Sequence, residues 1–399
     1  MLVPKLRFKR EDGTEYPEWE SYTIKNVATI KNGPFGSVLH SSDYVESGFP
    51  IITTEHFKSG FIQNDITSIP KVSEDDYKRL KGYVLQTNDI VFSRVGTVDI
   101  NALVSYRENG WLFSGRVIRV RPNSGYNSAY LHYLLSTQKV KNDIISRAVG
   151  QTMPSINSEI LNSTTLNITP EIEEQQKIAY FLSTVDEVIT QSEAEVQNLE
   201  QQKKAAMQKI FSQEVRFKRE DGSEYPEWEE KAVAEVFKIT RGYVLSAKLV
   251  KPIADNEYRY PVFSSQTKDN GLMGYYKEYL YENAITWTTD GANAGTVRFR
   301  KGKFYCTNVC GVLLNETGFA NQCIAEYLNS VAFKYVSYVG NPKLMNNIMA
   351  EIPIVFPCLE EQQKIADFLS AYDEAISYAK QEFDKWKELK KGLLQQMFV

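Results

Sequence analysis

The chain has 399 residues and a formal net charge of −4, with 42% hydrophobic and 24% charged side chains. This is the composition of a globular protein of about two to three domains, which argues against intrinsic disorder. It shows neither an apolar run long enough to cross a membrane nor a signal-peptide core, so we expect a cytoplasmic protein. The cysteines Cys306, Cys310, Cys323 and Cys358 fit a reducing compartment without disulfides.

A short block near the start of the chain is repeated later. Residues 6–20 read LRFKREDGTEYPEWE and residues 215–229 read VRFKREDGSEYPEWE, with 13 of 15 positions identical. An Asp-Gly pair in each copy predicts a turn. We expect residues 1–20 and 215–230 to form compact straps that pack on the ends of helices. We also expect the two termini of the chain to lie near each other.

The segments that follow the straps, residues 21–170 and 231–357, predict two mixed α/β domains. Each contains short runs rich in β-branched and aromatic residues, bounded by Gly, Asn or Asp, and then a helical stretch. Weak correspondences between the segments, such as Gly96 with Gly291, indicate one fold with two different surfaces.

Charge is unevenly distributed between these segments and the rest of the chain. Residues 21–170 hold 15 basic and 12 acidic side chains, residues 231–357 hold 14 and 10, and residues 171–230 hold 7 and 15. This distribution favours two domains that face phosphate on acidic connectors. A random scatter of a few charges is the alternative, because the excesses are small.

A second repeated block opens a long helix after each domain. Residues 173–189 and 360–376 are identical at 13 of 17 positions. From Ile178 and from Ile365, apolar residues recur alternately four and three positions apart, which is the seam of a coiled coil. Pro170 and Pro357 precede these helices, as proline is tolerated before a helix or in its first turn. The sequence therefore predicts conserved helices in 171–214 and 358–399.

The expected fold class is α+β, with two mixed α/β domains in a pseudo-twofold arrangement, separated by two long antiparallel coiled-coil helices. The alternative is that each helix only covers its own domain. A lysine interrupts each seam at the same register, at Lys203 and Lys390. Such a polar residue either fixes the register of the pair or contacts a third component.

The sequence shows no complete catalytic or cofactor motif. The three histidines and the Cys306-x-x-x-Cys310 pair lack metal-ligand spacing. The glycine-rich runs at 33–36 and 291–295 match neither a dinucleotide fingerprint nor a phosphate-binding loop. Asn341-Pro342-Lys343 matches only the first half of the Asn-Pro-Pro-Tyr motif of amino-methyltransferases. We therefore expect no catalysis, metal or cofactor in this chain.

Basic, hydroxyl and amide side chains near glycine turns are suited to phosphate contacts and to hydrogen bonds with base edges. Each of them taken alone is more often a solvated surface group. The candidate DNA-binding residues are Lys31, Ser37, Ser93, Arg94, Arg116, Arg119, Arg121, Arg241, Ser265, Gln266, Arg298, Arg300, Lys301, Asn341 and Lys343.

The repeated motif EEQQKIAxFLS at 173–183 and 360–370, followed by a long helix that ends KKGLLQQMF, resembles the DNA-specificity subunits of type I restriction-modification systems. The resemblance covers all 399 residues. It implies a non-catalytic subunit with target-recognition domains at 21–170 and 231–357. Each domain would read one half of an asymmetric bipartite site in double-stranded DNA, and the helices would set the spacer.

The resemblance also implies partner subunits. Two modification subunits would bind S-adenosylmethionine and methylate adenine, and restriction/translocase subunits would use ATP and Mg²⁺. Candidate docking residues on the repeated helices are Gln175, Gln176, Lys203, Gln362, Gln363 and Lys390. The competing hypotheses are a single-chain methyltransferase or nuclease and a coiled-coil scaffold with no nucleic-acid partner.

Overall fold

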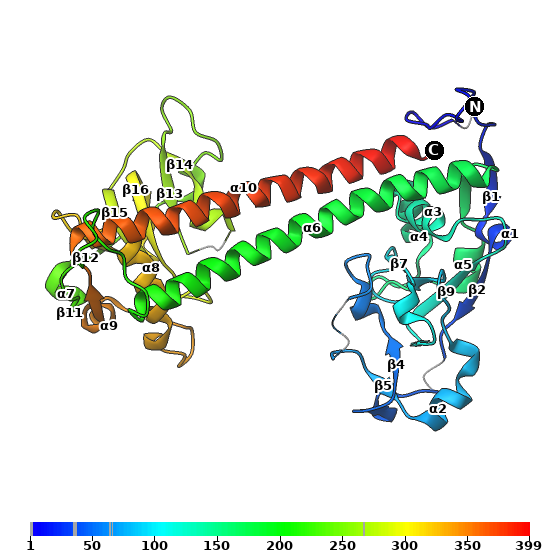
Figure 1. Cartoon of the computed structure of the whole chain (residues 1–399), viewed down its shortest axis with the longest axis horizontal. Helices are drawn as coiled ribbons and strands as arrows, with labels where there is room; N and C mark the ends of the chain where they lie inside the picture. Colours follow the sequence, from blue (N-terminus) through cyan, green and yellow to red (C-terminus); the bar gives the residue numbers. More distant parts are fainter. Residues whose placement is uncertain (1–2, 35–37, 64, 66, 266–267) are drawn as a thin grey trace. The chain divides into compact units, whose positions relative to one another are not determined.

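The chain divides into two compact units that do not coincide with its sequence repeats. The structure, a computed structural model, describes residues 3–34, 38–63, 65, 67–265 and 268–399. One unit comprises Met1–Glu193 and Gln381–Val399, and the other comprises Ala194–Lys380. The long helices α6 (Ile172–Phe211) and α10 (Leu359–Met397), green and orange to red in Figure 1, each contribute to both units. Each unit therefore combines the first part of one helix with the last part of the other.

The first unit contains an antiparallel four-stranded sheet of order β2-β9-β6-β7, a four-stranded sheet of order β3-β5-β4-β8, and the pair β1-β10. Its elements before α6 are β1 (Glu20–Thr23), α1 (Ile24–Val27), β2 (Ala28–Asn32), β3 (Tyr44–Val45), β4 (Phe49–Ile52), β5 (Lys71–Val72), α2 (Glu74–Arg79), β6 (Ile90–Ser93), β7 (Asn101–Leu103), β8 (Leu112–Phe113), β9 (Val117–Pro122), α3 (Ser128–Leu135), α4 (Gln138–Arg147), α5 (Ser158–Asn162) and β10 (Thr165–Ile168).

The second unit contains a six-stranded sheet of order β12-β17-β15-β16-β13-β14 and the pair β11-β18. Its elements between α6 and α10 are β11 (Glu229–Ala232), α7 (Val233–Val236), β12 (Lys238–Arg241), β13 (Tyr260–Phe263), β14 (Leu272–Tyr276), β15 (Tyr281–Thr288), β16 (Val297–Cys306), β17 (Cys310–Leu314), α8 (Gln322–Val331), α9 (Asn346–Glu351) and β18 (Pro353–Phe356). Mixed α/β content is thus confirmed for both predicted domains.

The two units share a core topology. β2, β9 and β6 pair in the same order as β12, β17 and β15, and all these pairs are antiparallel. Helix α3 starts after Asn127, whose side chain accepts a hydrogen bond from Tyr130 N at 2.9 Å. Helix α8 starts in the same way after Asn321, which accepts from Ile324 N at 3.1 Å. The weak correspondences in the sequence therefore do reflect one fold.

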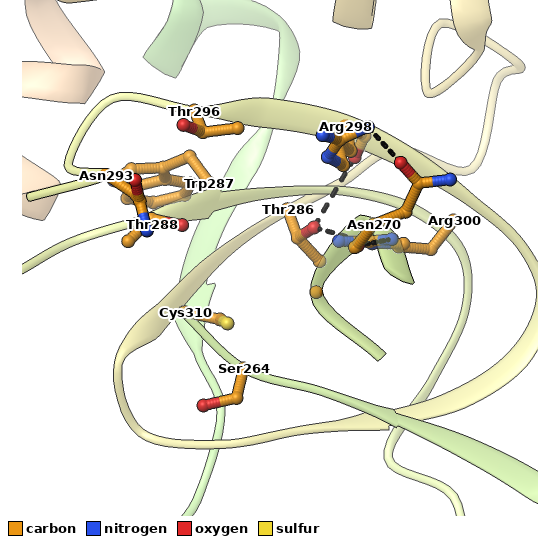
Figure 2. A pocket seen from close by; sticks show the side chains of 11 residues that line it. Ser264, Asn270, Thr286, Trp287, Thr288, Asn293, Thr296, Arg298, Arg300 and Cys310 are labelled. Atoms are coloured by element: carbon orange, nitrogen blue, oxygen red, sulfur yellow. Dashed lines mark hydrogen bonds between the residues drawn. The ribbon is translucent and has the colours of Figure 1, made fainter. Parts of the chain in front are cut away.

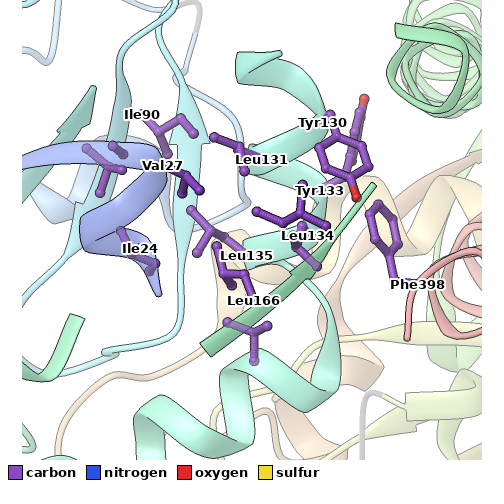
Figure 3. Packing of buried hydrophobic residues seen from close by; sticks show 14 of the residues in the cluster. Ile24, Val27, Ile90, Tyr130, Leu131, Tyr133, Leu134, Leu135, Leu166 and Phe398 are labelled. Atoms are coloured by element: carbon purple, nitrogen blue, oxygen red, sulfur yellow. The ribbon is translucent and has the colours of Figure 1, made fainter. Parts of the chain in front are cut away.

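The core of the first unit forms around α3. Its residues Tyr130, Leu131, Leu134 and Leu135 are buried, and Figure 3 shows them among side chains from α1, β6 and the end of α10. Phe398, just after α10, lies 5.5 Å from the Tyr130 ring, centroid to centroid. Burying each such side chain stabilises the fold by roughly 1.5–3 kcal/mol. The end of the chain is therefore part of the core of the first unit.

The predicted seam lies on the buried face of both helices. Ile178, Leu182 and Val185 are buried in the first unit, and Ile365 and Leu369 are buried in the second.

Within the second unit, α6 and α10 run antiparallel. Lys380 Nζ lies 2.6 Å from Glu200 Oε1, and Lys203 Nζ lies 2.8 Å from Asp373 Oδ1. The later residue of α6 thus contacts the earlier residue of α10, as antiparallel helices require. The equivalent pair in the first unit is Lys390 with Asp186, 2.5 Å apart. The antiparallel prediction is thus confirmed within the second unit. Each helix also packs on its own domain, but the pairing contradicts the alternative that it does only that.

The straps pack on the helix starts, as predicted. Arg7 Nε lies 2.7 Å from Glu174 Oε1 on α6, and Arg216 Nη2 lies 2.8 Å from Glu361 Oε2 on α10. Leu6 N also donates to Gln396 O at 2.9 Å, which confirms that the two ends of the chain are close. Among the described residues, no helix combines the length and the apolar character that a membrane span requires.

Candidate nucleic-acid interface

A glycine turn follows the central strand of each domain. In the first unit β6 ends at Ser93 and leads to Gly96, whose φ is 86°. In the second unit β15 ends at Thr288 and leads to Gly291, whose φ is 94°. Glycine adopts this left-handed backbone without the steric cost that a side chain brings.

The same backbone contact holds both turns. Gly96 N donates to Pro154 O at 2.8 Å, and Gly291 N donates to Pro342 O at 3.0 Å. Both domains therefore have the same backbone turn at the end of the central strand.

Three of the candidate residues gather beside the turn of the first unit. Ser93 and Arg116 line one cavity together with Lys58 and Met153. Arg94 and Arg116 line a neighbouring cavity. Arg116 is exposed, whereas Ser93 is buried and donates to Thr97 O. The exposed guanidinium can meet a phosphate or a base edge, but the Ser93 hydroxyl is already bonded within the fold.

Arg121 bonds to a carboxylate within the fold, and its assignment to the DNA interface stays a prediction. Its Nε and Nη2 lie 2.6 and 2.7 Å from the two carboxylate oxygens of Asp89, which is buried. This bidentate bond raises the pKa of Arg121. The sequence pattern placed Arg121 on a strand face correctly but gave no sign of its partner, 32 residues away.

Arg119 and Lys31 are cross-strand neighbours on β9 and β2. Burial and the nearby Arg121 lower the pKa of Arg119, and its Nε has no hydrogen-bond partner among the described residues. The Lys31 ammonium lies 4.7 Å from the centroid of the Tyr83 ring. Neither residue lines the two cavities beside the turn, so the structure does not bring them together with Arg94 and Arg116.

A polar pocket in the second unit holds two of the predicted arginines (Figure 2). Arg298 and Arg300 line it from alternate positions of β16, which confirms that they share a face. Arg300 Nε donates to Thr286 Oγ1 at 3.1 Å, and its guanidinium lies 3.7 Å from the Phe263 ring centroid. Arg298 Nη1 donates to Asn270 Oδ1 at 2.9 Å.

Burial and the neighbouring Arg298 lower the pKa of Arg300 to about 10, so it stays protonated at neutral pH. Because Thr286, Asn270 and Phe263 hold the guanidinium in place, little entropy is lost when it binds an acceptor. The pocket therefore offers a fixed cation to a phosphate or to a base acceptor.

The remaining candidates of the second unit differ in their exposure and contacts. Arg241, Lys301 and Asn341 are exposed, and Lys343 Nζ lies 3.8 Å from Asp290. Ser265 is half-buried, and its carbonyl accepts from Asn293 at 3.0 Å. None of these residues lines the arginine pocket. Ser37 and Gln266 lie outside the described residues.

The docking prediction is wrong for Gln175 and Gln362. Both side chains are fully buried. The Gln175 amide accepts from Asn127 N at 2.8 Å and donates to Thr169 O at 3.0 Å. The Gln362 amide accepts from Asn321 Nδ2 at 2.7 Å and donates to Pro357 O at 2.7 Å. The repeated glutamines therefore join each helix start to its domain and leave no surface for a partner.

The other docking candidates differ in their exposure. Gln176 and Gln363 are exposed on the helix surface. Lys203 and Lys390 are engaged within the chain, in ion pairs to Asp373 and Asp186 respectively. The structure thus favours the register-fixing alternative for the two lysines.

Sequence reasoning missed Met153 and Lys58, which line the cavity with Arg116. Pro154 could have indicated this region, because it is equivalent to Pro342 of the second unit. Both proline carbonyls accept a hydrogen bond from the glycine of the turn. Across the described ranges, no three His, Cys, Asp or Glu side chains come together in a way that could hold a metal ion.

Comparison with known proteins identifies the family. The model of the type I restriction modification DNA specificity domain matches residues 16–201 and again 225–385. A putative type I specificity subunit of Mycoplasma pneumoniae is 32% identical over 51% of this chain and 80% of its own length. A putative type I restriction enzyme specificity subunit of Methanocaldococcus jannaschii is 28% identical over 97% of this chain and 94% of its own.

Solved structures show the same fold. The type I restriction-modification S subunit from M. genitalium matches with a TM-score of 0.64 and 16% identity, covering 100% of this chain and 99% of that one. A chain from a study of complex assembly and conformational transition of the type I system matches with a TM-score of 0.55 and 15% identity, covering 96% and 98%. The chain therefore belongs to the DNA-specificity subunits of type I restriction-modification systems, the non-catalytic recognition components of those systems.

Proposed function

We propose that each domain reads one half of an asymmetric bipartite site in double-stranded DNA, and that α6 and α10 set the spacer between the halves. The glycine turns of the two domains, with the cationic groups beside them, would face the duplex. Arg116 and Arg94 serve the first domain, and Arg298 and Arg300 serve the second. Guanidinium groups are suited both to phosphate oxygens and to the O6 and N7 acceptors of guanine.

One observation carries this proposal: equivalent backbone positions bear unlike side chains. Arg94 N donates to Arg116 O at 2.9 Å in the first unit. In the second unit Thr289 N donates to Val309 O at 3.0 Å. The same turn thus carries two arginines in one domain and a threonine and a valine in the other. Two surfaces that differ in this way suit two different half-sites.

The helices support the role of a spacer. The Lys203–Asp373 and Lys390–Asp186 pairs join the seams at equivalent registers, which resists sliding of one helix along the other. Each helix spans about 60 Å at roughly 1.5 Å per residue. That length exceeds the roughly 34–36 Å that separates half-sites one turn apart on B-DNA.

The proposal includes partners that supply the chemistry. Two modification subunits would bind S-adenosylmethionine and methylate adenine, and restriction/translocase subunits would use ATP and Mg²⁺. The exposed Gln176 and Gln363 on the repeated helices are the docking candidates that remain available. A DNA partner also places the complex in the cytoplasm.

An exchange of domains tests this function. Residues 21–170 would be replaced by the corresponding domain of a related subunit, and the chain would be expressed with its modification subunits. Sequencing of methylated bases in those cells should show one half-site changed, with the other half and the spacer preserved. A change in both half-sites would refute the assignment of one half to each domain.

A further inference from the structure

Each domain carries a short loop that packs against its glycine turn, and the proposed function so far gives these loops no role. In the first unit, Val149 and Ser155 exchange backbone hydrogen bonds of 2.9 and 2.8 Å. In the second unit, Ser337 and Lys343 exchange two bonds of 2.9 Å. Residues 149–155 and 337–343, called here the two tip loops, are thus closed in the same way and have the same length.

The tip loops are anchored to the turn at equivalent points. The proline of each loop accepts from the turn glycine, as described above, and the residue after each loop also bonds to the turn. Ile156 N donates to Arg94 O, and Leu344 N donates to Thr289 O, both at 2.9 Å. Gly150 and Gly340 have φ values of 102° and 77°, so each loop also contains a residue in the left-handed region. Both loops are therefore held in position relative to the reading surface.

The tips of these loops are apolar and face solvent. Val339 is 92% exposed, Tyr338 is 68% exposed, Val149 is 67% exposed and Met153 is 58% exposed. Isolated exposed apolar residues are common on protein surfaces. Here, however, they recur on equivalent loops of two domains whose sequences have otherwise diverged. Such recurrence indicates that both loops contact something apolar.

We propose that the tip loops place these apolar side chains against DNA bases, in contact with a thymine methyl group or a partly unstacked base step. This inference rests on the proposed function, because it assumes that the turns face DNA. Phosphates offer an apolar side chain no favourable contact, whereas thymine methyl groups do, and apolar wedges enter base steps in several DNA-binding proteins.

The surroundings of Met153 favour DNA over a protein partner. Met153 lines a cavity together with Arg116 and the ion pair of Lys58 with Glu55, so an apolar group stands beside the exposed guanidinium of Arg116. In the second unit, Val339 lies in the same loop as Asn341 and Lys343, which offer an amide and an ammonium group. A duplex presents this combination, with phosphates flanking base edges and methyl groups.

The test compares the salt dependence of DNA binding. The complex of the full chain with its modification subunits would be titrated with a duplex that carries the methylated motif mapped in cells, at several salt concentrations. We expect Met153→Ala and Val339→Ala to weaken binding about fivefold at every salt concentration, because an apolar contact releases no counterions. Arg116→Ala should instead reduce the slope of log affinity against log salt by about one.

A matched control separates this effect from general loss of surface area. Tyr106 is 86% exposed but lies outside the tip loops, so Tyr106→Ala should bind as the unsubstituted complex does. Since Met153 and Val339 are also exposed, their removal should leave the thermal unfolding midpoint unchanged, which excludes misfolding as the cause.

The possible outcomes are distinct. If the unsubstituted complex does not prefer the mapped duplex over a scrambled one, the proposed function itself fails. If it does prefer that duplex while Met153→Ala and Val339→Ala bind equally well, the inference is overturned and the function stands. A loss of affinity that comes with a reduced salt slope also overturns the inference, because the loops would then act on phosphates.

Discussion

Several frame contacts recur at equivalent residues of the two units, whereas the side chains around their glycine turns differ. Arg7–Glu174 and Arg216–Glu361 are the same contact made twice, as are Lys390–Asp186 and Lys203–Asp373. Beside the turns, by contrast, Arg94 stands in one unit where Thr289 stands in the other. Residues that determine geometry have remained duplicated, and residues that meet a ligand have diverged. Structural and recognition residues therefore differ in how far the two copies of the unit agree.

The largest expected effect comes from breaking the strap contact. Glu174 and Glu361 are fully buried, so removal of Arg7 or Arg216 leaves a carboxylate without its cation. Losing one partner of a buried ion pair costs about 3–5 kcal/mol. Arg7→Ala should destabilise the chain more than Arg216→Ala does. Trp228 Nε1 still donates to Glu361 at 2.8 Å, whereas Trp19 Nε1 has no partner among the described residues.

Urea unfolding of the two variants checks this prediction. Trp228→Phe combined with Arg216→Ala supplies the control, because it should raise the cost to that of Arg7→Ala. Equal destabilisation by Arg7→Ala and Arg216→Ala would show that the indole does not support the carboxylate.

The next effect concerns pH and distinguishes the two units. Burial, together with the nearby charges of Lys390 and Lys141, lowers the pKa of His132 to about 3. His132 therefore stays neutral in the folded state. In the unfolded state the same imidazole takes up a proton below a pKa of about 6.5. The stability that neutral His132 contributes is complete above about pH 6.5 and is lost progressively as the pH falls from there toward 3. Between pH 7 and pH 5 the loss should be about 2 kcal/mol.

The equivalent position in α8 is Glu326, whose carboxylate lies 2.7 Å from Lys203 Nζ. All three histidines of the chain lie in the first unit, so the His132 imidazole should make the first unit unfold first on acidification. Denaturant unfolding of His132→Gln at pH 7 and pH 5 provides the measurement. The variant should lose this pH dependence, and a variant as acid-sensitive as the unsubstituted chain would rule His132 out as its source.

A smaller effect is expected at the arginine pocket. Arg300→Lys keeps the charge but loses the bond to Thr286 and the planar contact with Phe263. Affinity for the cognate duplex should fall by about 1 kcal/mol, or roughly fivefold, with the loss confined to one half-site. Binding to duplexes mutated in one half-site at a time measures this. Arg121→Lys is the matched control, because Arg121 bonds to Asp89 and should affect stability instead.

The architecture was predictable from the sequence because its signals are local. The four-three spacing from Ile178 and from Ile365 marks one helix face, and that face is the buried one. The repeated straps predicted contacts at helix ends, and the structure places them at the helix starts. The division into compact units was not predictable from repeats alone, because each unit takes parts of both long helices.

The candidate site was only partly predictable, because long-range pairing decides which polar groups are free. Arg121 and Arg116 look alike in sequence, yet Asp89 engages only Arg121. Gln175 and Gln176 are adjacent and equally polar, yet only Gln175 faces the domain and is buried. The first tip loop was overlooked because its anchor to Gly96 joins residues far apart in the chain.

The central claim is that the duplicated frame sets distance while the diverged surfaces choose bases. Inserting one heptad after Glu193 and another after Lys380 tests it most directly, because these positions are the unit boundaries and keep the contacts within each unit. Each insertion adds roughly 10 Å of helix, equivalent to about three base pairs. Methylated-base sequencing should then reveal the same two half-sites separated by a spacer about three base pairs longer. An unchanged spacer, or altered half-sites, would contradict the account.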